Sequence, residues 1–151
     1  MLFFVPLGGG AFVAGVAIAV KHAKPEVKII GVEPEGANSM YLSLKKDKLV
    51  GIEKANTIAD GLAVGRPGAR PFEIARKYVD EVVVVSDEEI KKAMILLLER
   101  AKLLVDPSGA ASLAAIISKK LDFKDKEVVV ILSGGNIDLD KFSNILKEEI
   151  T

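Results

Sequence analysis

Several residue types that often carry protein chemistry are missing or scarce in this 151-residue sequence. It contains no cysteine, which excludes disulfide frameworks, iron–sulfur clusters, thiolate zinc sites and cysteine nucleophiles. His22 is the single histidine, so histidine-rich metal centres are excluded, and a Ser/His/Asp relay would have to pass through that residue. Aromatic residues form only 5% of the chain although 50% of it is hydrophobic, so the core must be mainly aliphatic.

An excess of charge of either sign is also missing. Lysine and arginine number 21 and aspartate and glutamate number 21, so the chain lacks the broad positive field of proteins that bind nucleic acids or acidic membranes. We therefore expect neither nucleic acid nor a membrane among its partners. The length predicts a single domain over residues 1–151.

The first twenty residues carry no charge, and Ala17-Ile18-Ala19 imitates the cleavage site of a signal peptide. A secretory leader begins with basic residues, and none precede this apolar segment, which Pro6 and several glycines also interrupt. The same interruptions argue against a membrane span. The pattern favours a strand, a glycine loop and a buried helix in a cytoplasmic protein.

Hydrophobic periodicity predicts strands that alternate with helices. The expected strands cover residues 2–6, 28–33, 81–85 and 127–132; the expected helices cover residues 11–23, 38–46, 71–78, 90–104, 108–119 and 140–148. An Asn38 cap, a Ser86/Glu89 capping box and an Asp106 cap are expected to begin three of the helices. Residues 50–70 are expected to form the longest loop.

Near-continuous apolar strands joined by helices predict an α/β fold, with three α/β/α layers around a mainly parallel sheet. The carboxyl ends of parallel strands open at one edge, where ligands of such folds bind. Two glycine clusters follow strands at that edge, Gly8-Gly9-Gly10 and Ser133-Gly134-Gly135-Asn136. The sequence therefore predicts that both clusters border one binding crevice.

The residues alone leave the role of each cluster open. Gly8, Gly9 and Gly10 could bind a phosphate through backbone N–H groups at a helix end, or could form only a tight turn. A dinucleotide site is a weaker alternative: Glu33 stands where a ribose-binding acid would, but Val13 occupies a position that needs glycine or alanine. No chemistry is assigned to His22.

Five motifs in series resemble the carboxyl-terminal half of the threonine dehydratases. They are Val5-Pro6-Leu7-Gly8-Gly9-Gly10, Gly31-Val32-Glu33-Pro34, Thr57-Ile58-Ala59-Asp60-Gly61, Asp106-Pro107-Ser108-Gly109-Ala110 and Ser133-Gly134-Gly135-Asn136. The resemblance extends to serine dehydratases and serine racemases, and it implies a part of the large domain of the tryptophan synthase β-like (fold-type II) enzymes. It also implies pyridoxal 5'-phosphate (PLP) as cofactor and amino-acid metabolism as the setting.

The resemblance assigns cofactor-binding roles position by position. The glycine loop that holds the cofactor phosphate corresponds to Gly8, Gly9, Gly10 and Ala11, where the fourth position departs from glycine. Ser133 corresponds to the residue that hydrogen-bonds the pyridine nitrogen, and Asp106 lies near the ring where relatives usually have glutamate.

A cation site is also implied by the resemblance. Glu33 and the carbonyl of Ala37 correspond to two ligands of a cation in the family. The third ligand, an acid in the racemases, corresponds to Ser39, so a divalent ion would be weakly held.

The catalytic lysine of the family has no counterpart. It lies in a Ser-x-Lys-x-Arg motif, and Ser43-Leu44-Lys45 imitates that motif only superficially, with Lys45 expected on a surface helix. We therefore expect no catalytic residue here, and a chain that is not competent alone as a threonine or serine dehydratase. The expected partners are an amino-acid substrate and either a missing amino-terminal half or further copies of the chain. The alternatives are a non-catalytic PLP- or anion-binding remnant or interaction domain and, less favoured, a nicotinamide-dinucleotide domain.

Overall fold

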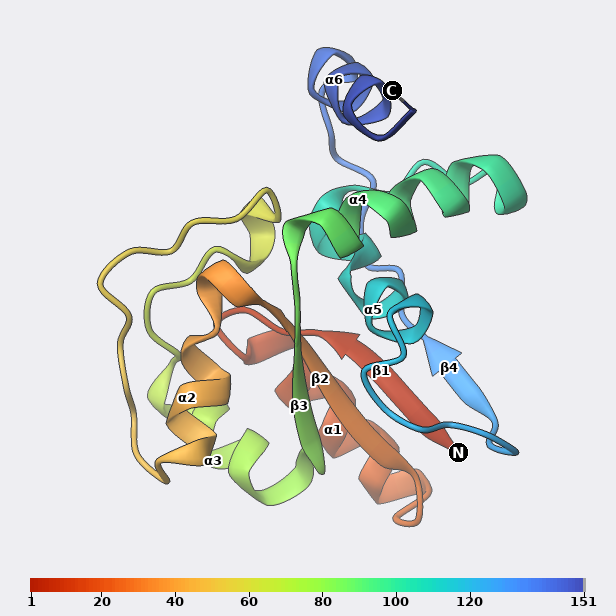
Figure 1. Cartoon of the computed structure of the whole chain (residues 1–151). Helices are drawn as coiled ribbons and strands as arrows, with labels where there is room; N and C mark the ends of the chain where they lie inside the picture. Colours follow the sequence, from red (N-terminus) through yellow and green to blue (C-terminus); the bar gives the residue numbers. More distant parts are fainter. Residues whose placement is uncertain (151) are drawn as a thin grey trace.

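A computed structural model describes residues 1–150 of the chain. Four strands alternate with six α-helices and three single-turn helical segments in the described part (Figure 1). The elements are β1 (Leu2–Pro6), α1 (Ala11–Ala23), β2 (Lys28–Pro34), η1 (Glu35–Ala37), α2 (Ser39–Lys45), η2 (Asp60–Leu62), α3 (Ala69–Tyr78), β3 (Glu81–Val85), α4 (Asp87–Leu96), η3 (Leu97–Ala101), α5 (Pro107–Ile117), β4 (Val128–Val130) and α6 (Leu139–Ile150).

The four strands form one parallel sheet in the order β3-β2-β1-β4. Pro6 of β1 pairs with Val32 of β2, and Phe4 of β1 pairs with Val130 of β4, so the carboxyl ends of these strands lie at the same edge. This arrangement confirms the predicted α/β class and the parallel sheet.

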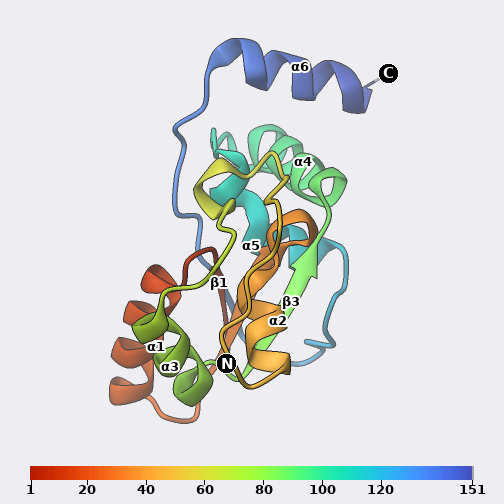
Figure 2. The same ribbon diagram turned by 90° about the vertical axis from the view of Figure 1, so that its left-hand side faces the viewer.

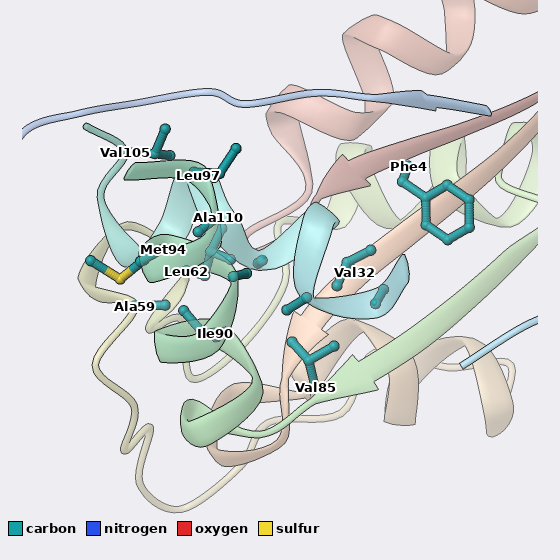
Figure 3. Packing of buried hydrophobic residues seen from close by; sticks show 14 of the residues in the cluster. Phe4, Val32, Ala59, Leu62, Val85, Ile90, Met94, Leu97, Val105 and Ala110 are labelled. Carbon is teal, nitrogen blue, oxygen red and sulfur yellow. The ribbon is translucent and has the colours of Figure 1, made fainter. Parts of the chain in front are cut away.

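Side chains of β1 and β2 alternate between two cores because successive residues of a strand point to opposite faces. Phe4 and Val32 contribute to the core under α4 and α5 (Figure 3), whereas Val5 and Ile29 contribute to the core under α1 and α3. Figure 2 shows α1 and α3 together on one side of the sheet and α4 and α5 on the other. Both faces are covered, which explains why these strands are apolar along their whole length.

All three predicted N-cap residues stand at helix starts, but only two of them cap the helix with their side chains. Ser86 and Glu89 form the expected capping box of α4, and the Asp106 carboxylate accepts a hydrogen bond from Gly109 N at the start of α5. Asn38 makes no side-chain capping bond at α2. The carboxylate of Glu33 reaches the first turn of that helix instead, and it satisfies the backbone donors that the Asn38 side chain was expected to satisfy.

The predicted apolar helix over residues 90–104 is interrupted. It continues past α4 only as the π-helical turn η3, and Lys102 follows with a φ of 59°. That left-handed residue turns the chain back toward α5, so Leu104 is 43% exposed instead of packing in the predicted stripe. The turn brings Asp106 to the edge of the sheet where the strands end.

The last predicted strand is shorter than expected. Of residues 127–132, only Val128–Val130 pair as β4, which is hydrogen-bonded to β1 on one side.

In the described residues no helix is long and apolar enough to cross a membrane.

Candidate active site: a pocket at the carboxyl ends of the strands

The glycine loop between β1 and α1 offers unused backbone donors. The N–H groups of Gly8, Gly9 and Gly10 donate no hydrogen bond within residues 1–150, and they lie at the N-terminal end of α1. Gly10 has a φ of +95°, and a Cβ added to it would lie 2.8 Å from Cβ of Pro71. A Cβ added to Gly8 would lie 2.9 Å from Cα of Leu62. Loop shape and orphan donors together fit an anionic oxygen group such as a phosphate.

The segment η2 packs against the glycine loop and is fixed from two other helices. Gly61 N donates to Oγ of Ser108 on α5 at 2.9 Å. Thr57 Oγ1 donates to Oδ1 of Asp87 on α4 at 2.5 Å, and Ile58 N donates to Oδ2 of the same carboxylate at 3.1 Å. These bonds hold the middle of the long 50–70 loop against the sheet edge.

The turn that follows β4 is attached to the start of α5. Asp106 Oδ2 accepts from Asn136 N at 3.1 Å, and Asp106 N donates to the carbonyl of Gly134 at 3.1 Å. Ser133 lies in this turn with an exposed side chain. The attachment places its hydroxyl on the same edge as the glycine loop.

These loops enclose a pocket of about 690 Å³. All six residues predicted to bind the cofactor line it: Gly8, Gly9, Gly10, Ala11, Asp106 and Ser133. The structure thus brings together two glycine clusters that lie more than a hundred residues apart in the sequence. Their roles toward a ligand stay predictions.

Several polar residues that line the pocket received no role from the sequence, among them Ser108, Asp138 and Lys141. The Nζ of Lys141 lies 2.8 Å from Oδ2 of Asp60 and 3.3 Å from the carbonyl of Ile58. The amphipathic pattern of residues 139–150 gives a helix, but nothing in it says where that helix lies, so the sequence carried no signal for Lys141 at the pocket. Ser108 lies in the Asp106-Pro107-Ser108-Gly109-Ala110 motif, which is the signal that points to it.

The residues expected to hold a cation are used differently. Glu33 is fully buried and lies outside the pocket lining; its Oε1 accepts from Met40 N at 2.9 Å and its Oε2 from Tyr41 N at 2.7 Å. Ser39 Oγ donates to the carbonyl of Val64. No cluster of three or more acidic, histidine or cysteine side chains that could hold a metal occurs among the described residues. A single carboxylate whose two oxygens already accept backbone N–H groups fits a divalent ion poorly.

Burial controls the ionisation of Glu33. Desolvation raises the pKa of Glu33 to about 8, against the opposing effect of the hydrogen bonds from Tyr41 and Met40. The same burial removes Glu33 from the role of a ribose-binding acid at the pocket. Lys45 is exposed on α2, as predicted, and His22 is exposed on the last turn of α1.

A parallel α/β sheet with a glycine loop and a polar turn at the carboxyl ends of its strands is the arrangement in which ligands of α/β folds bind. The sequence profile of the family described as "Pyridoxal-phosphate dependent enzyme" matches residues 2–134. The chain belongs to this family.

Individual relatives and solved structures support this family assignment. The L-threonine ammonia-lyase of Thermotoga maritima is 45% identical over 144 residues, which cover 95% of this chain and 36% of that protein. The processed form of threonine deaminase isoform 2 from Solanum lycopersicum superimposes with a TM-score of 0.89 at 35% identity, covering 97% of this chain and 41% of that one. Maize serine racemase superimposes with a TM-score of 0.88 at 35% identity, covering 98% and 48%. The predicted resemblance to threonine dehydratases and the fold-type II architecture are confirmed, and the chain spans less than half the length of each of these proteins.

Proposed function

We propose that this chain supplies the cofactor-phosphate side of the PLP site in a threonine or serine dehydratase, an enzyme that converts L-threonine or L-serine to a 2-oxo acid and ammonia. The observation that carries the proposal is the shared pocket. Unused N–H groups of Gly8, Gly9 and Gly10 face it from one side, and Ser133 faces it from another. A ligand with a phosphate at one end and a ring nitrogen at the other would use both.

Each side of the pocket has a defined task. The N–H groups of the glycine loop donate to the phosphate, and the positive end of α1 favours its charge. The Ser133 hydroxyl donates to the pyridine nitrogen, and as a neutral partner it leaves that nitrogen unprotonated. When bound, PLP supplies the electron withdrawal that acidifies the α-proton of an amino acid. A neutral nitrogen partner limits this withdrawal, which suits loss of a β-hydroxyl group.

We propose further that the chain does not carry out the reaction alone. The reaction would need a lysine amine that holds the cofactor and moves the α-proton of the substrate. Among the described residues Lys141 is the one lysine that lines the pocket, and its Nζ is already held by the carboxylate of Asp60 and the carbonyl of Ile58. The lysine must therefore come from residues other than these.

Calorimetric titration tests the binding role. Pyridoxine 5'-phosphate is the appropriate probe because it has the ring and the phosphate of PLP but no aldehyde to react with surface lysines. We expect it to bind more tightly than inorganic phosphate, and we expect Ser133→Ala to weaken it about tenfold, the effect of one lost hydrogen bond. Ser143→Ala on α6 is the matched control. Equal affinity for both probes, unaffected by Ser133→Ala, would favour the alternative of an anion-binding remnant.

Activity is tested separately. The chain with PLP and L-threonine or L-serine should form no 2-oxo acid, and activity should arise when a segment with the Ser-x-Lys-x-Arg motif from a relative is co-expressed. Turnover by the chain alone would refute the second part of the proposal.

A further inference from the structure

The Asp106 carboxylate joins two segments that are far apart in the sequence. Oδ1 accepts from Gly109 N at 2.8 Å in the first turn of α5, and Oδ2 accepts from Asn136 N in the turn that carries Ser133. The backbone N–H of Asp106 donates to the carbonyl of Gly134 and its own carbonyl accepts from Ala110 N, so four hydrogen bonds surround this residue. Both carboxylate oxygens are occupied by protein donors.

The neighbouring Ser108 makes the matching connection on the other side. Its Oγ accepts from Gly61 N of η2, and the next residue of η2, Leu62, lies against Gly8 of the phosphate loop. A continuous path therefore runs from the phosphate loop through η2 and the first turn of α5 to Ser133.

Close backbone contacts occur along this path. A Cβ added to Gly109 would lie 2.8 Å from both N and O of Gly134, and a Cβ added to Gly135 would lie 2.8 Å from the carbonyl oxygen of Leu104. Backbone thus rests directly on backbone where the Ser133 turn meets α5.

We propose that Asp106 and Ser108 are positioning residues, which fix the separation between the phosphate loop and Ser133 so that one rigid ligand can reach both. The inference rests on the proposed function. It assigns to Asp106 a task other than contact with the ring: the carboxylate sets the place of the Ser133 hydroxyl. Two anchor points that a ligand must satisfy together bind it well only when their spacing is fixed in advance.

The chemistry of asparagine allows a selective test. Asp106→Asn keeps one side-chain oxygen, which can still cap α5, because asparagine is as good an N-cap as aspartate. The amide nitrogen that replaces the second oxygen is a donor and cannot accept from Asn136 N. This variant therefore releases the Ser133 turn and leaves the helix start intact. Ser108→Ala removes the hydroxyl that accepts from Gly61 N and leaves the hydrogen bonds of Asp106 in place.

Amide hydrogen exchange without ligand is the first measurement. We expect exchange at Asn136 to accelerate at least about fivefold in Asp106→Asn with Gly61 unchanged, and the opposite pattern in Ser108→Ala. Unchanged exchange at both amides would refute the positioning role of Asp106 and Ser108, whether or not the chain binds a cofactor.

Titration is the second measurement. Asp106→Asn should weaken pyridoxine 5'-phosphate about tenfold and leave inorganic phosphate within about twofold, since phosphate alone needs only the glycine loop. Asp106→Glu, which retains two acceptor oxygens, should restore most of the affinity. Asp138→Asn removes the same charge from the same pocket and should affect both probes alike.

The outcomes separate the two proposals. Equal weakening of both probes by Asp106→Asn, or weakening of neither, overturns the positioning role while wild-type binding still supports the proposed function. A wild-type chain that binds phosphate but prefers no pyridine ligand overturns the proposed function, and the positioning role for such a ligand with it.

Discussion

Replacing Glu33 by glutamine should change the stability of the protein in opposite directions at low and high pH. Glu33 is fully buried, and burial raises its pKa to about 8 from the ordinary value of 4.5. Because the folded-state pKa lies above the unfolded one, the stability that Glu33 contributes is complete below about pH 4.5 and is lost as the pH rises through 8.

The magnitude follows from that difference. A rise from 4.5 to about 8 corresponds to about 5 kcal/mol of stability, lost at about 1.4 kcal/mol for each pH unit between those values. Glutamine cannot ionise, but its NH₂ group would face one of the two backbone donors, Met40 N or Tyr41 N, at a cost of about 1–3 kcal/mol. Glu33→Gln should therefore be less stable than the wild type at pH 5, and the order should be reversed by pH 8.5.

Urea denaturation of both proteins at several pH values between 5 and 8.5 measures this difference directly. Glu89→Gln is the matched control, since it also removes a carboxyl from the start of a helix. Burial alone would raise the pKa of Glu89, but the hydrogen bond and ion pair with Lys120 and the capping bond with Ser86 N hold it below its usual value. Its contribution is lost only on acidification, so the Glu89→Gln difference should be flat above pH 5.5. A Glu33→Gln deficit that grows with pH would refute the reasoning.

Four further predictions test other features of the structure. Ser112→Ala should stabilise the protein by about 1–2 kcal/mol in urea denaturation, because the buried Ser112 hydroxyl has no hydrogen-bond partner among the described residues and alanine is a better helix former. A loss of stability would show that the hydroxyl has a partner. Borohydride treatment with PLP followed by peptide mapping should show no single lysine that is labelled stoichiometrically. A unique label on Lys141 would show that its ion pair with Asp60 does not keep it from the cofactor aldehyde. Millimolar Mg²⁺ or Ca²⁺ should leave the melting temperature unchanged within about 1 °C, and a concentration-dependent rise would restore the cation site at Glu33. Light scattering at micromolar concentration should show a homodimer or larger assembly, with an interface of more than about 1,000 Å². The reasons are that β4 is paired with a neighbouring strand on one side only and that Phe12 and Ile18 of α1 are nearly half exposed. A concentration-independent monomer would contradict this prediction.

The strand ends and glycine clusters of this site could be predicted from the sequence because each depends on local pattern. A short apolar run, glycines and a following apolar helix already imply that Gly8, Gly9 and Gly10 lie at the edge of a parallel sheet. The capping roles of Ser86 and Asp106 are equally local, since each bonds a donor three residues away.

The features that the sequence did not predict depend on partners that are distant in the chain. The start of α2 was assigned to Asn38, whereas its backbone donors are satisfied by Glu33 from the end of β2, seven and eight residues away. The second bond of Asp106, to Asn136 N, spans 30 residues, and the bond of Lys141 to Asp60 spans 81. Periodicity says which face of a helix is apolar but not which loop its polar face will meet. The exposed Leu104 has the same origin, because the turn at Lys102 is imposed by the path to α5.

The glycines that border the pocket have a consequence for how such a site can evolve. Where Gly8 meets Leu62 and Gly109 meets Gly134, the wall is main chain against main chain, so almost any replacement inserts an atom into occupied space. Selection can remove this part of the pocket but has few single steps by which to reshape it. Changes in the shape of the pocket are therefore expected at positions with side chains to exchange, such as Asp138 and Lys141, rather than at these glycines.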